Sequence, residues 1–494
     1  MINRRTFLKL TGVAALMPWG CTPYRSGSAG VLVNDVHSGL NPTQVREVIA
    51  VRSIQDIQHA MERAASDRLA ISVAGGRHAM GAQQFGTDSL HLDTRSFNRV
   101  LNFDPDSGLM EAEAGVQWPD LIQASLAMQA GSTQQWGIVQ KQTGADRLSI
   151  GGALSANIHG RGLTLKPFVG DVESFTLVMS DGRTLRCSRS QNPELFKLAV
   201  GGYGLFGILT AVTLRLMPRR KLRRVVELVE ISDVMKRFEQ RIQEGFLFGD
   251  CQFAIDPASK DFLSRGIFSC YRPVDPSTPI PANQREIAED QWLRLLYLAH
   301  ADKAKAFEVY SNEYLATDGQ LYWSDTHQMS YYPEGYHRSL DQRMQAPSPG
   351  SEMISELYVP RAELAAFFAD MREDFRRHGT EVIYGTIRLI ERDDESFLAW
   401  ARQPWACTVL NLHVSHTPGG IERAAAAFRR LIDLARKRGG SYFLTYHKWA
   451  TREQVLACYP QFPEFLKLKR RFDPEERFQS DWYRHYRTMF SDVL

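Results

Sequence analysis

The stretch SVAGGRHAMGAQ, residues 72–83, combines three glycines with an arginine and a histidine. Residues 69–74 predict a buried strand that runs into it, and SLHLD, residues 89–93, predicts a second strand after it. A dinucleotide-binding Rossmann loop leads instead into a helix, whose N-terminus holds the pyrophosphate. A phosphate bound by this strand-to-strand loop would therefore be held by backbone N–H groups in a nest, which glycines permit through close approach and unusual dihedral angles.

Two other glycine-rich segments must also be judged by the elements that follow them. GYGLFG, residues 202–207, matches G-x-G-x-x-G, but the ILTAVTLRL that follows is rich in β-branched residues and predicts a strand, which argues against a nicotinamide site. LSIGGALSANIHGRG, residues 148–162, has two readings. It is a tight structural turn, or a ligand-binding segment with several hydrogen-bonding side chains.

The elements around the first loop follow from periodicity. Residues 53–65 predict a helix capped by Ser53 with Asp56 three positions later, and its apolar face comprises Ile54, Ile57, Met61 and Ala64. Residues 99–115 predict a hairpin, and Trp118-Pro119 opens a helix that runs to about Gln129.

The pattern of residues changes near residue 221. Charged helical segments appear first, followed by the strand-like segments SEMISELYVP (351–360), EVIYGTIRLIE (381–391) and TVLNLHVSH (408–416). Residues 419–440 predict an amphipathic helix with glycines at both ends. Residues 221–430 are therefore expected to form a second lobe of mixed α/β structure.

Composition limits the class of protein. The 494 residues are 44% hydrophobic and 23% charged, which predicts two or more compact lobes. The net charge of +3 and the lack of a long Lys/Arg run argue against a nucleic-acid partner, and no apolar stretch is long enough to span a bilayer. The six cysteines are too widely spaced for a zinc pattern, so no metal site is predicted, and an isolated disulfide is left open.

The N-terminus has the pattern of an export signal. Asn3-Arg4-Arg5-Thr6-Phe7-Leu8-Lys9 is a twin-arginine motif, and the apolar run from Leu10 to Trp19 follows it. The alternative is a frayed basic N-terminus. Residues 1–30 are therefore expected to engage the export machinery and to direct a cofactor-loaded protein to the periplasm. Cys21 is a weaker candidate for a lipid anchor, because Pro18 and Trp19 stand where small residues are expected.

The order of these motifs resembles the FAD-binding domain of the vanillyl-alcohol oxidase and para-cresol methylhydroxylase (PCMH) family. The resemblance covers residues 41–220 and continues weakly through SELYVPR (355–361), LTYHKW (444–449) and FDPEERFQSDW (472–482). It implies an α+β fold: a two-subdomain PCMH-type FAD-binding domain, a substrate or cap domain over residues 221–430, and a C-terminal segment, 431–494, that completes the flavin site.

The resemblance also implies which residues contact FAD. In many family members the residue matching His78 bonds covalently to the 8α methyl of the flavin, between a glycine and a serine that are here Arg77 and Ala79. Non-covalent packing on the flavin and a purely structural histidine are the alternatives for His78. The expected cofactor-binding residues are Ala74, Gly75, Gly76, Arg77, His78, Ala79, Met80, Gly81, Gln83, Thr143, Gly144, Asp146, Ser149, Gly152, Ser155, His159 and Ile208.

Candidates for catalysis come from period-two alternation along the predicted strands. Thr386 and Arg388 share one face, and Asn411, His413 and Ser415 share another, so these polar faces line a cavity or are solvated. Glu356 is a third candidate from this lobe. His447 and Lys448 are adjacent and are expected to point apart, and an imidazole is the better base near neutral pH.

The sequence thus predicts an FAD-dependent oxidoreductase, similar to bacterial sugar, alditol and lactone oxidases. It would oxidise a hydroxyl group of a sugar, polyol or lactone by hydride transfer to flavin N5, with oxygen or another acceptor taking the electrons. One alternative is a reductase or desaturase of a lipid-like substrate with non-covalent FAD. The other is a flavin electron-relay protein without catalysis.

Overall fold

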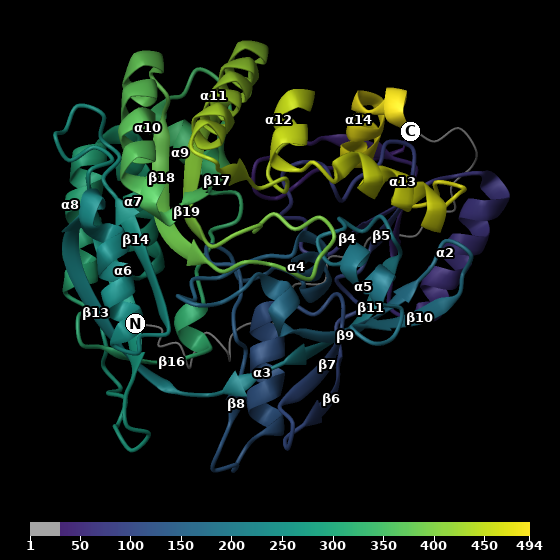
Figure 1. The fold of residues 1–494 in the computed structure, drawn as a ribbon, viewed down its shortest axis with the longest axis horizontal. Helices are drawn as coiled ribbons and strands as arrows, with labels where there is room; N and C mark the ends of the chain where they lie inside the picture. The colour runs from purple at the N-terminus through teal and green to yellow at the C-terminus, as the bar shows by residue number, and fades with distance from the viewer. Residues whose placement is uncertain (1–29) are drawn as a thin grey trace. The chain divides into compact units, whose positions relative to one another are not determined.

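The computed structural model describes residues 30–494. The twin-arginine motif and Cys21 lie outside the described residues. Within the described part of the chain, no helix is both long and apolar enough to cross a membrane. The chain is a mixed α/β protein built on three main sheets (Figure 1).

The first sheet is parallel and has three strands in the order β3-β5-β4. Helix α2 (Ile54–Asp67) crosses over between its outer strands, and the predicted Ser53–Asp56 capping box is present. Ile57, Met61 and Ala64 of the predicted apolar face are buried against this sheet. The strands are β3 (Glu47–Ala50), β4 (Ile71–Ala74) and β5 (Leu90–Asp93), and a hairpin of β1 (Val31–Val33) and β2 (Thr43–Val45) precedes them.

The second sheet is antiparallel, in the order β10-β9-β11-β7-β6. Its strands are β6 (Val100–Asp104), β7 (Leu109–Glu113), β9 (Val172–Val178), β10 (Thr184–Ser188) and β11 (Ile208–Arg215). The predicted 99–115 hairpin and the strand after residue 207 are therefore confirmed. The connections contain α3 (Trp118–Met128), α4 (Ile150–Ala156), α5 (Pro193–Ala199) and the paired short strands β8 (Trp136–Gly137) and β12 (Met217–Pro218).

The third sheet has eight antiparallel strands in the order β16-β13-β15-β14-β18-β19-β17-β20. The predicted strands of the second lobe are found as its central members. The strands are β13 (Lys221–Glu230), β14 (Phe248–Phe253), β15 (Arg265–Pro273), β16 (Leu321–Trp323), β17 (Gly350–Pro360), β18 (Val382–Ile390), β19 (Trp405–Ser415) and β20 (Ser441–Tyr442). Since β20 pairs with β17, this sheet continues past residue 430, the boundary expected for the second lobe.

Helices cover both faces of the eight-stranded sheet. Helices α10 (Leu364–His378) and α11 (Pro418–Lys437) pack on its apolar face, where Phe368 of α10 meets Phe253 of β14. Three other helices lie over the opposite, polar face: α7 (Glu289–Ala301), α8 (Lys303–Leu315) and α9 (Tyr336–Met344). Helix α6 (Val234–Gln243) follows β13.

The C-terminal helices return to the first sheet. They are α12 (Arg452–Cys458), α13 (Phe462–Phe472) and α14 (Asp481–Met489). In Figure 1, α13 and α14 lie on the side of β4, β5 and α2, whereas α12 lies next to α11. Ile71 of β4 pairs with Phe478 through a parallel bridge, and Asp481 accepts hydrogen bonds from the backbone N–H and hydroxyl of Thr87. Short 3-10 turns complete the path: η1 (Phe168–Asp171), η2 (Ile231–Asp233), η3 (Thr326–Gln328), η4 (Arg361–Glu363) and η5 (Ser491–Val493).

Candidate functional site

The loop after β4 packs tightly on the segment before α4. A Cβ atom on Gly75 would lie 2.1 Å from Ser149 Oγ, and one on Gly76 would lie 2.4 Å from the carbonyl oxygen of Arg147. Only glycine allows this approach. Among the described residues, the backbone N–H groups of residues 75–80 have no hydrogen-bond acceptor. The loop is therefore a short run of free amide donors held against Ser149.

The same loop contains a strained residue. Arg77 has a φ of 58°, in the left-handed region that favours glycine, and its carbonyl oxygen accepts a hydrogen bond from the N–H of Val36 at 3.0 Å. Ala79 and Met80 follow, and the Met80 carbonyl accepts a bond from Asn41. The loop conformation is thus fixed from the side of the β1–β2 hairpin.

Gln83 joins this loop to the C-terminal segment. Its Oε1 accepts a bond from the N–H of Gly81 at 3.0 Å, and its Nε2 donates to the carbonyl oxygens of Thr445 at 2.5 Å and Leu444 at 3.3 Å. The end of the glycine loop and residues 444–445 therefore form one hydrogen-bonded unit.

His78 projects from the loop with an unpartnered nitrogen. Its Nδ1 is buried and has no hydrogen-bond partner among the described residues. Burial, with a further contribution from the charge of Arg77, lowers the pKa of His78 to about 4. The imidazole is therefore neutral at physiological pH. Its nearest rings are those of Tyr332, at 5.9 Å, and His37, at 6.5 Å.

The second glycine segment contains a helix, which the sequence did not predict. Ser149 caps α4 by accepting a bond from the N–H of Gly152 at 3.3 Å, and the carbonyl oxygen of Ser155 accepts one from Tyr203 at 2.9 Å. The glycines obscured the helix, because they lower helix propensity. The Gly75 contact places Ser149 at the first loop, while Gly152 is exposed on α4.

The segment before α4 is held by charged groups. Asp146 accepts bonds from the buried Lys141 Nζ at 2.8 Å and from the N–H of Ser330 at 2.8 Å. Thr143 Oγ1 accepts a bond from the guanidinium of Arg388, on β18. Gly144 is exposed and has a φ of 100°. These contacts join the predicted FAD-binding segment to the eight-stranded sheet.

Ile208 stands apart from the loops. It is the first residue of β11, pairs with Val178 of β9, and packs in the apolar cluster beneath the first sheet. Its side chain belongs to the core, so any ligand contact from Ile208 would come from its backbone.

The polar faces expected from alternation form one surface on the eight-stranded sheet. Arg388 pairs with Cys407, Thr386 with Val409, and Glu356 with Val409, so these side chains project from the same face. Thr386 and Glu356 are fully buried, and Arg388 is 6% exposed. The solvated alternative does not hold for these three residues. Asn411 and His413 lie further along the same face and are partly buried.

Glu356 is the centre of a buried hydrogen-bond network. Its Oε2 lies 2.8 Å from His159 Nε2 and accepts a bond from the hydroxyl of Tyr358 at 2.8 Å. Its Oε1 accepts a bond from the hydroxyl of Tyr446 at 2.8 Å. Burial raises the pKa of the Glu356 carboxyl, but His159 and Arg388 outweigh it and the net pKa is lowered. The Cys407 thiol lies 3.9 Å from Oε2, and burial raises its pKa, so it stays protonated.

The partners of His159 fix its protonation. Its Nδ1 lies 3.0 Å from the carbonyl oxygen of Gly160, which only accepts hydrogen bonds, so Nδ1 carries a hydrogen. The 2.8 Å contact between Nε2 and Glu356 then needs one more proton. His159 and Glu356 therefore share a proton, as imidazolium with carboxylate or as imidazole with carboxylic acid.

The structure does not bring His447 into this network. Its ring is buried and stacks on Trp449 at 5.6 Å and Tyr442 at 5.9 Å, with Phe428 of α11 at 4.5 Å. Burial lowers the pKa of His447 to about 3. The neighbouring Tyr446, which the sequence did not single out, reaches Glu356 instead. In the sequence, the only indication for Tyr446 was its position next to His447.

The expected strand alternation does not apply to His447 and Lys448, because β20 ends at Tyr442 and residues 443–450 lie outside any strand. Burial lowers the pKa of Lys448, against the opposing charge of Asp481 on α14. Lys448 therefore lies by the C-terminal helices, and no hydrogen bond joins it to Glu356 in the described structure. The roles of His447 and Lys448 in catalysis remain predictions.

A second buried carboxylate lies on the same strand as Glu356. Glu352 is surrounded by His300 of α7, His337 of α9 and His413 of β19, and it accepts a bond from the hydroxyl of Tyr336. Of this group the sequence singled out only His413. The alternation Glu352-Ile354-Glu356 along β17 was the signal that would have found Glu352.

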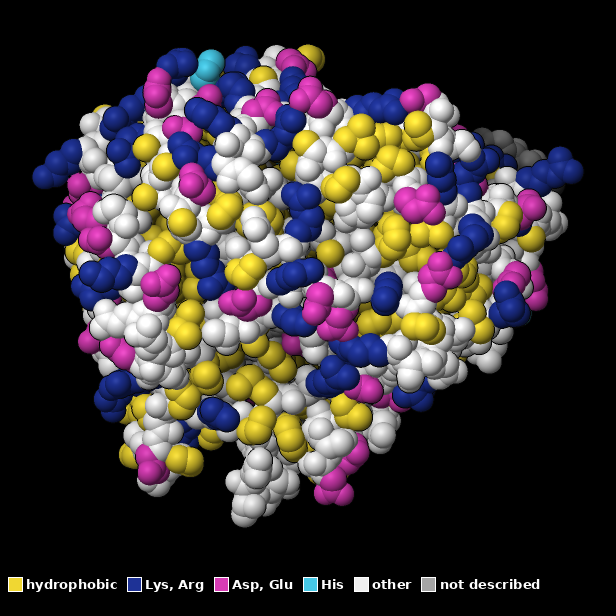
Figure 2. Space-filling view, viewed as in Figure 1, with side chains coloured by type: hydrophobic (Ala, Val, Ile, Leu, Met, Phe, Trp, Pro, Cys, Tyr) yellow, Lys and Arg dark blue, Asp and Glu magenta, His cyan; other side chains and the backbone are white. Residues whose placement is uncertain are grey.

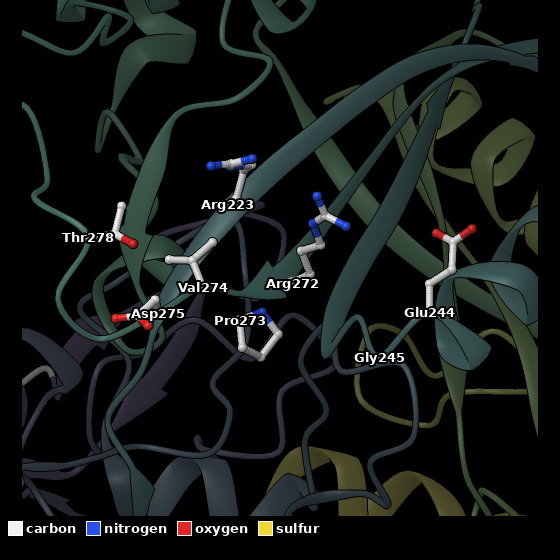
Figure 3. Close-up of a pocket in the computed structure, with 8 residues that line it drawn as sticks. All are labelled: Arg223, Glu244, Gly245, Arg272, Pro273, Val274, Asp275 and Thr278. Atoms are coloured by element: carbon white, nitrogen blue, oxygen red, sulfur yellow. The ribbon is translucent and has the colours of Figure 1, made fainter.

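A separate hollow of about 530 Å³ opens elsewhere on the eight-stranded sheet (Figure 3). It lies where β13 begins and β15 ends, and none of the predicted site residues lines it. Its lining residues are Arg223, Glu244, Gly245, Arg272, Pro273, Val274, Asp275 and Thr278.

The parallel sheet, its glycine loop and the partnered segment 143–159 all lie within one continuous part of the chain. Residues 45–188 match the family described as "FAD binding domain". The chain therefore contains an FAD-binding domain of the PCMH type, and the resemblance seen in the sequence is confirmed.

Three curated relatives show how far the likeness extends. An "uncharacterized oxidoreductase ORF5 in fasciation locus" of Rhodococcoides fascians is 32% identical over 34% of this chain and 37% of its own length. The L-gulonolactone oxidase of Bos taurus is 23% identical over 40% of this chain and 43% of its own length. The L-gulono-1,4-lactone dehydrogenase of Mycobacterium tuberculosis is 21% identical over 81% of this chain and 86% of its own length. The chain thus spans less than half the length of the first two relatives.

Proposed function

We propose that this protein is an FAD-linked oxidoreductase that oxidises a CH–OH group of a sugar, polyol or lactone. The observation that carries the proposal is the proton-sharing pair of His159 and Glu356, which joins the FAD-binding domain to a buried polar surface of the eight-stranded sheet. The printed activities of two relatives, an L-gulonolactone oxidase and an L-gulono-1,4-lactone dehydrogenase, support the substrate class. Oxygen or another redox partner would accept the electrons.

The residues present fit FAD. The free N–H groups of residues 75–80 suit the pyrophosphate, and a Cβ on Gly75 or Gly76 would break the contact that shapes their nest. Next to the nest, Nδ1 of His78 is buried and unpartnered in the described structure. When bound, FAD supplies an acceptor for hydride.

The chain's own groups would handle the proton and the substrate oxygens. Removal of a hydroxyl proton needs a buried base within hydrogen-bond reach, and the His159–Glu356 pair can exchange one proton between its two members. The guanidinium of Arg388 has an unpartnered, buried Nε, and Thr386 Oγ1 is also unpartnered in the described structure. Both groups can hydrogen-bond a substrate with several hydroxyl groups or a lactone carbonyl.

A covalent link to the flavin through His78 is the second part of the proposal. Its neutral imidazole and free Nδ1 support it, because a bond-forming nitrogen needs an available lone pair. Arg77 stands where the resemblance has glycine, and its φ of 58° lies in the left-handed region that favours glycine.

The two alternatives make different demands. A reductase or desaturase of a lipid-like substrate needs an apolar wall, whereas Thr386, Arg388 and Glu356 are polar and point into the same buried face. An electron-relay protein would bind FAD that no small alcohol reduces. The polar face and the shared proton favour the oxidoreductase.

Anaerobic mixing tests the proposal. Purified protein with FAD is mixed with sugars, polyols, aldonolactones and hydroxy acids, and the flavin absorbance is followed. Bleaching with one of these classes is expected. Bound FAD that bleaches with dithionite but with none of the alcohols would favour the relay and reject the oxidoreductase.

The proposal extends to location. The twin-arginine motif, which lies outside the described residues, would export the FAD-loaded protein to the periplasm. Arg4→Lys with Arg5→Lys is expected to retain it in the cytoplasmic fraction, and unchanged fractionation would contradict this. Cys21→Ala tests the lipid anchor by loss of membrane association.

Neither the sequence nor the visible surface points to a nucleic-acid partner. Figure 2 shows Lys and Arg side chains interspersed with Asp and Glu over the face that it displays. A small-molecule substrate and an electron acceptor are the partners that the proposal requires.

A further inference from the structure

Glu352 is a carboxylate buried among histidines. The side chain is 1% exposed, and His300 Nε2 lies 2.9 Å from its Oε1. His413 Nδ1 lies 3.6 Å from the same oxygen, and His337 Nδ1 lies 3.0 Å from Oε2. Since burying a carboxylate is costly unless it is fully paired, this concentration of nitrogen atoms needs an explanation.

Three of these atoms lie close together without forming hydrogen bonds to one another. His300 Nε2, Glu352 Oε1 and His413 Nδ1 all lie within 4.8 Å of one another. Each is buried, and none makes a hydrogen bond of acceptable angle to a described residue. Two imidazole nitrogens and a carboxylate oxygen that face a common point without hydrogen bonds between them are a ready set of metal ligands.

The fold brings these ligands together from three elements. Glu352 and His413 are directly paired across β17 and β19, so their side chains project from the same face. His300 comes from the last turn of α7, which is fastened to β18 because Lys303 Nζ donates to the carbonyl oxygens of Ala299 and Val382. The set therefore rests on regular structure.

Gly350 shapes the position of His413. A Cβ atom on this glycine would lie 2.4 Å from Cε1 and 2.9 Å from Nε2 of the His413 ring. The missing side chain thus leaves room for the ring against the start of β17, with Nδ1 3.6 Å from Glu352 Oε1. Gly350 has no need of glycine for its dihedral angles, so ring placement is the physical reason for it.

The second oxygen of Glu352 has its own partners. His337 Nδ1 and the hydroxyl of Tyr336 both approach Oε2. Such outer contacts hold a ligating carboxylate in place and tune its donor strength. Oε1 is left to face the two imidazoles.

We propose that His300 Nε2, Glu352 Oε1 and His413 Nδ1 bind one divalent transition-metal ion of the zinc type. Imidazole and carboxylate ligands suit Zn²⁺, whereas Ca²⁺ and Mg²⁺ prefer oxygen-only sets. Three protein ligands leave a coordination position for water or another small ligand. The partial exposure of His413, 21% for its side chain, gives the ion a route to the site.

The site lies on the side of the sheet that faces the glycine loop. The ring of Tyr336 is 6.0 Å from that of Tyr332, which in turn is 5.9 Å from that of His78. Zinc binding at this site does not depend on flavin chemistry. The protein can bind zinc whether or not alcohols reduce its flavin.

The test measures metal binding to the full-length protein with its FAD. The protein is treated with a chelator, desalted, incubated with ZnCl₂, desalted again and analysed for metal by mass spectrometry. One zinc per chain is expected to be retained, and MgCl₂ in place of ZnCl₂ should leave no bound metal. A wild-type protein that retains no zinc after this treatment would overturn the proposal.

Variants assign the ligands. His413→Ala and His300→Ala are expected to reduce retained zinc to below about one tenth, because a missing ligand costs more than the roughly 10–100-fold loss seen for outer contacts. His337→Ala should weaken zinc binding by about 10–100-fold without abolishing it. His378→Ala, on the exposed side of α10, is the matched control and should retain one zinc.

Folding is checked separately, since Glu352→Gln alters a buried charge. Circular dichroism and flavin content identify folded variants, and His413→Ala removes the most exposed ligand. Folded His300→Ala and His413→Ala proteins that both keep one zinc per chain would overturn the assignment. A wild-type protein that retains no zinc after incubation with ZnCl₂, but whose flavin an alcohol bleaches, would reject the metal and leave the proposed function intact.

Discussion

His159 Nε2 lies 2.8 Å from Glu356 Oε2, and the two residues share one proton between the FAD-binding domain and the eight-stranded sheet. His159 comes from the segment after α4 and Glu356 from the middle of β17, 197 residues later. The contact therefore couples the position of the flavin-binding segment to the protonation of the sheet. It also orients the carboxylate for Tyr446 on its other oxygen.

Glu356→Gln should slow flavin reduction by roughly 100-fold or more, because the amide cannot exchange the shared proton. Anaerobic stopped-flow absorbance with a reducing substrate measures the rate. Glu308→Gln, at an exposed site on α8, is the control and should leave the rate unchanged. An equal rate in Glu356→Gln and the control would remove Glu356 from the proton path.

His78→Ala should release any covalent flavin, since no other nucleophile in the glycine loop projects with an unpartnered nitrogen in the described structure. Acid precipitation reads this directly. Yellow colour should stay in the wild-type pellet and move to the supernatant for the variant. Colour in the wild-type supernatant would reject the covalent link, and colour in the variant pellet would place the link elsewhere.

Gly76→Ala should weaken FAD binding and lower the free energy of unfolding by about 1–3 kcal/mol, because its Cβ would meet the Arg147 carbonyl at 2.4 Å. Thermal unfolding and flavin content measure the two effects. Gly419→Ala is the matched control, since at the start of α11 its Cβ would meet only the flexible end of Arg423 at 3.4 Å. Full flavin content in Gly76→Ala would show that the close approach is dispensable.

His447→Phe tests the packing of the C-terminal segment by pH. Burial lowers the pKa of His447 from 6.5 to about 3, so the unfolded chain binds its proton first as the pH falls. Its contribution to stability is therefore complete above pH 6.5 and is lost at about 1.4 kcal/mol per pH unit toward pH 3. The variant should lose less stability than the wild type between pH 6.5 and 5.

Urea unfolding at several pH values measures how the free energy of unfolding changes with pH. The variant His59→Phe, at an exposed site, is the control. Parallel pH profiles for His447→Phe and the wild type would contradict the buried neutral state. The same variant separates packing from catalysis. A 100-fold slower flavin reduction would support the sequence-based prediction of His447 as the base, and an unchanged rate would exclude it.

Much of the fold was predictable because it depends on local pattern. The capping box at Ser53 and the apolar face with Ile57 and Met61 specify α2, and strict alternation specifies β17, β18 and β19. Helix α4 was missed, because Gly151 and Gly152 suppress the local helix signal while the Ser149 cap and buried Ile150 restore it in context.

The candidate site was only partly predictable, for a different reason. The sequence named His159 and Glu356 separately, but their contact depends on how the FAD-binding domain meets the sheet. His447 and Tyr446 show the same limit: the sequence favoured His447 for the site, but packing brings Tyr446 to Glu356 and buries His447 against Phe428. His300, Glu352 and His413 come from distant segments with no motif spacing, so no sequence pattern could place them together.

The bonds from Gln83 to the carbonyl oxygens of Leu444 and Thr445 join residues 361 and 362 positions apart. A ribosome that has made the glycine loop must therefore add most of the polypeptide before the partners of Gln83 exist. Closure of the loop, and stable uptake of the flavin with it, is expected only after translation ends. A premature stop codon near the 3′ end of the message would then yield a chain whose N-terminal lobe is fully encoded and yet cannot retain its cofactor.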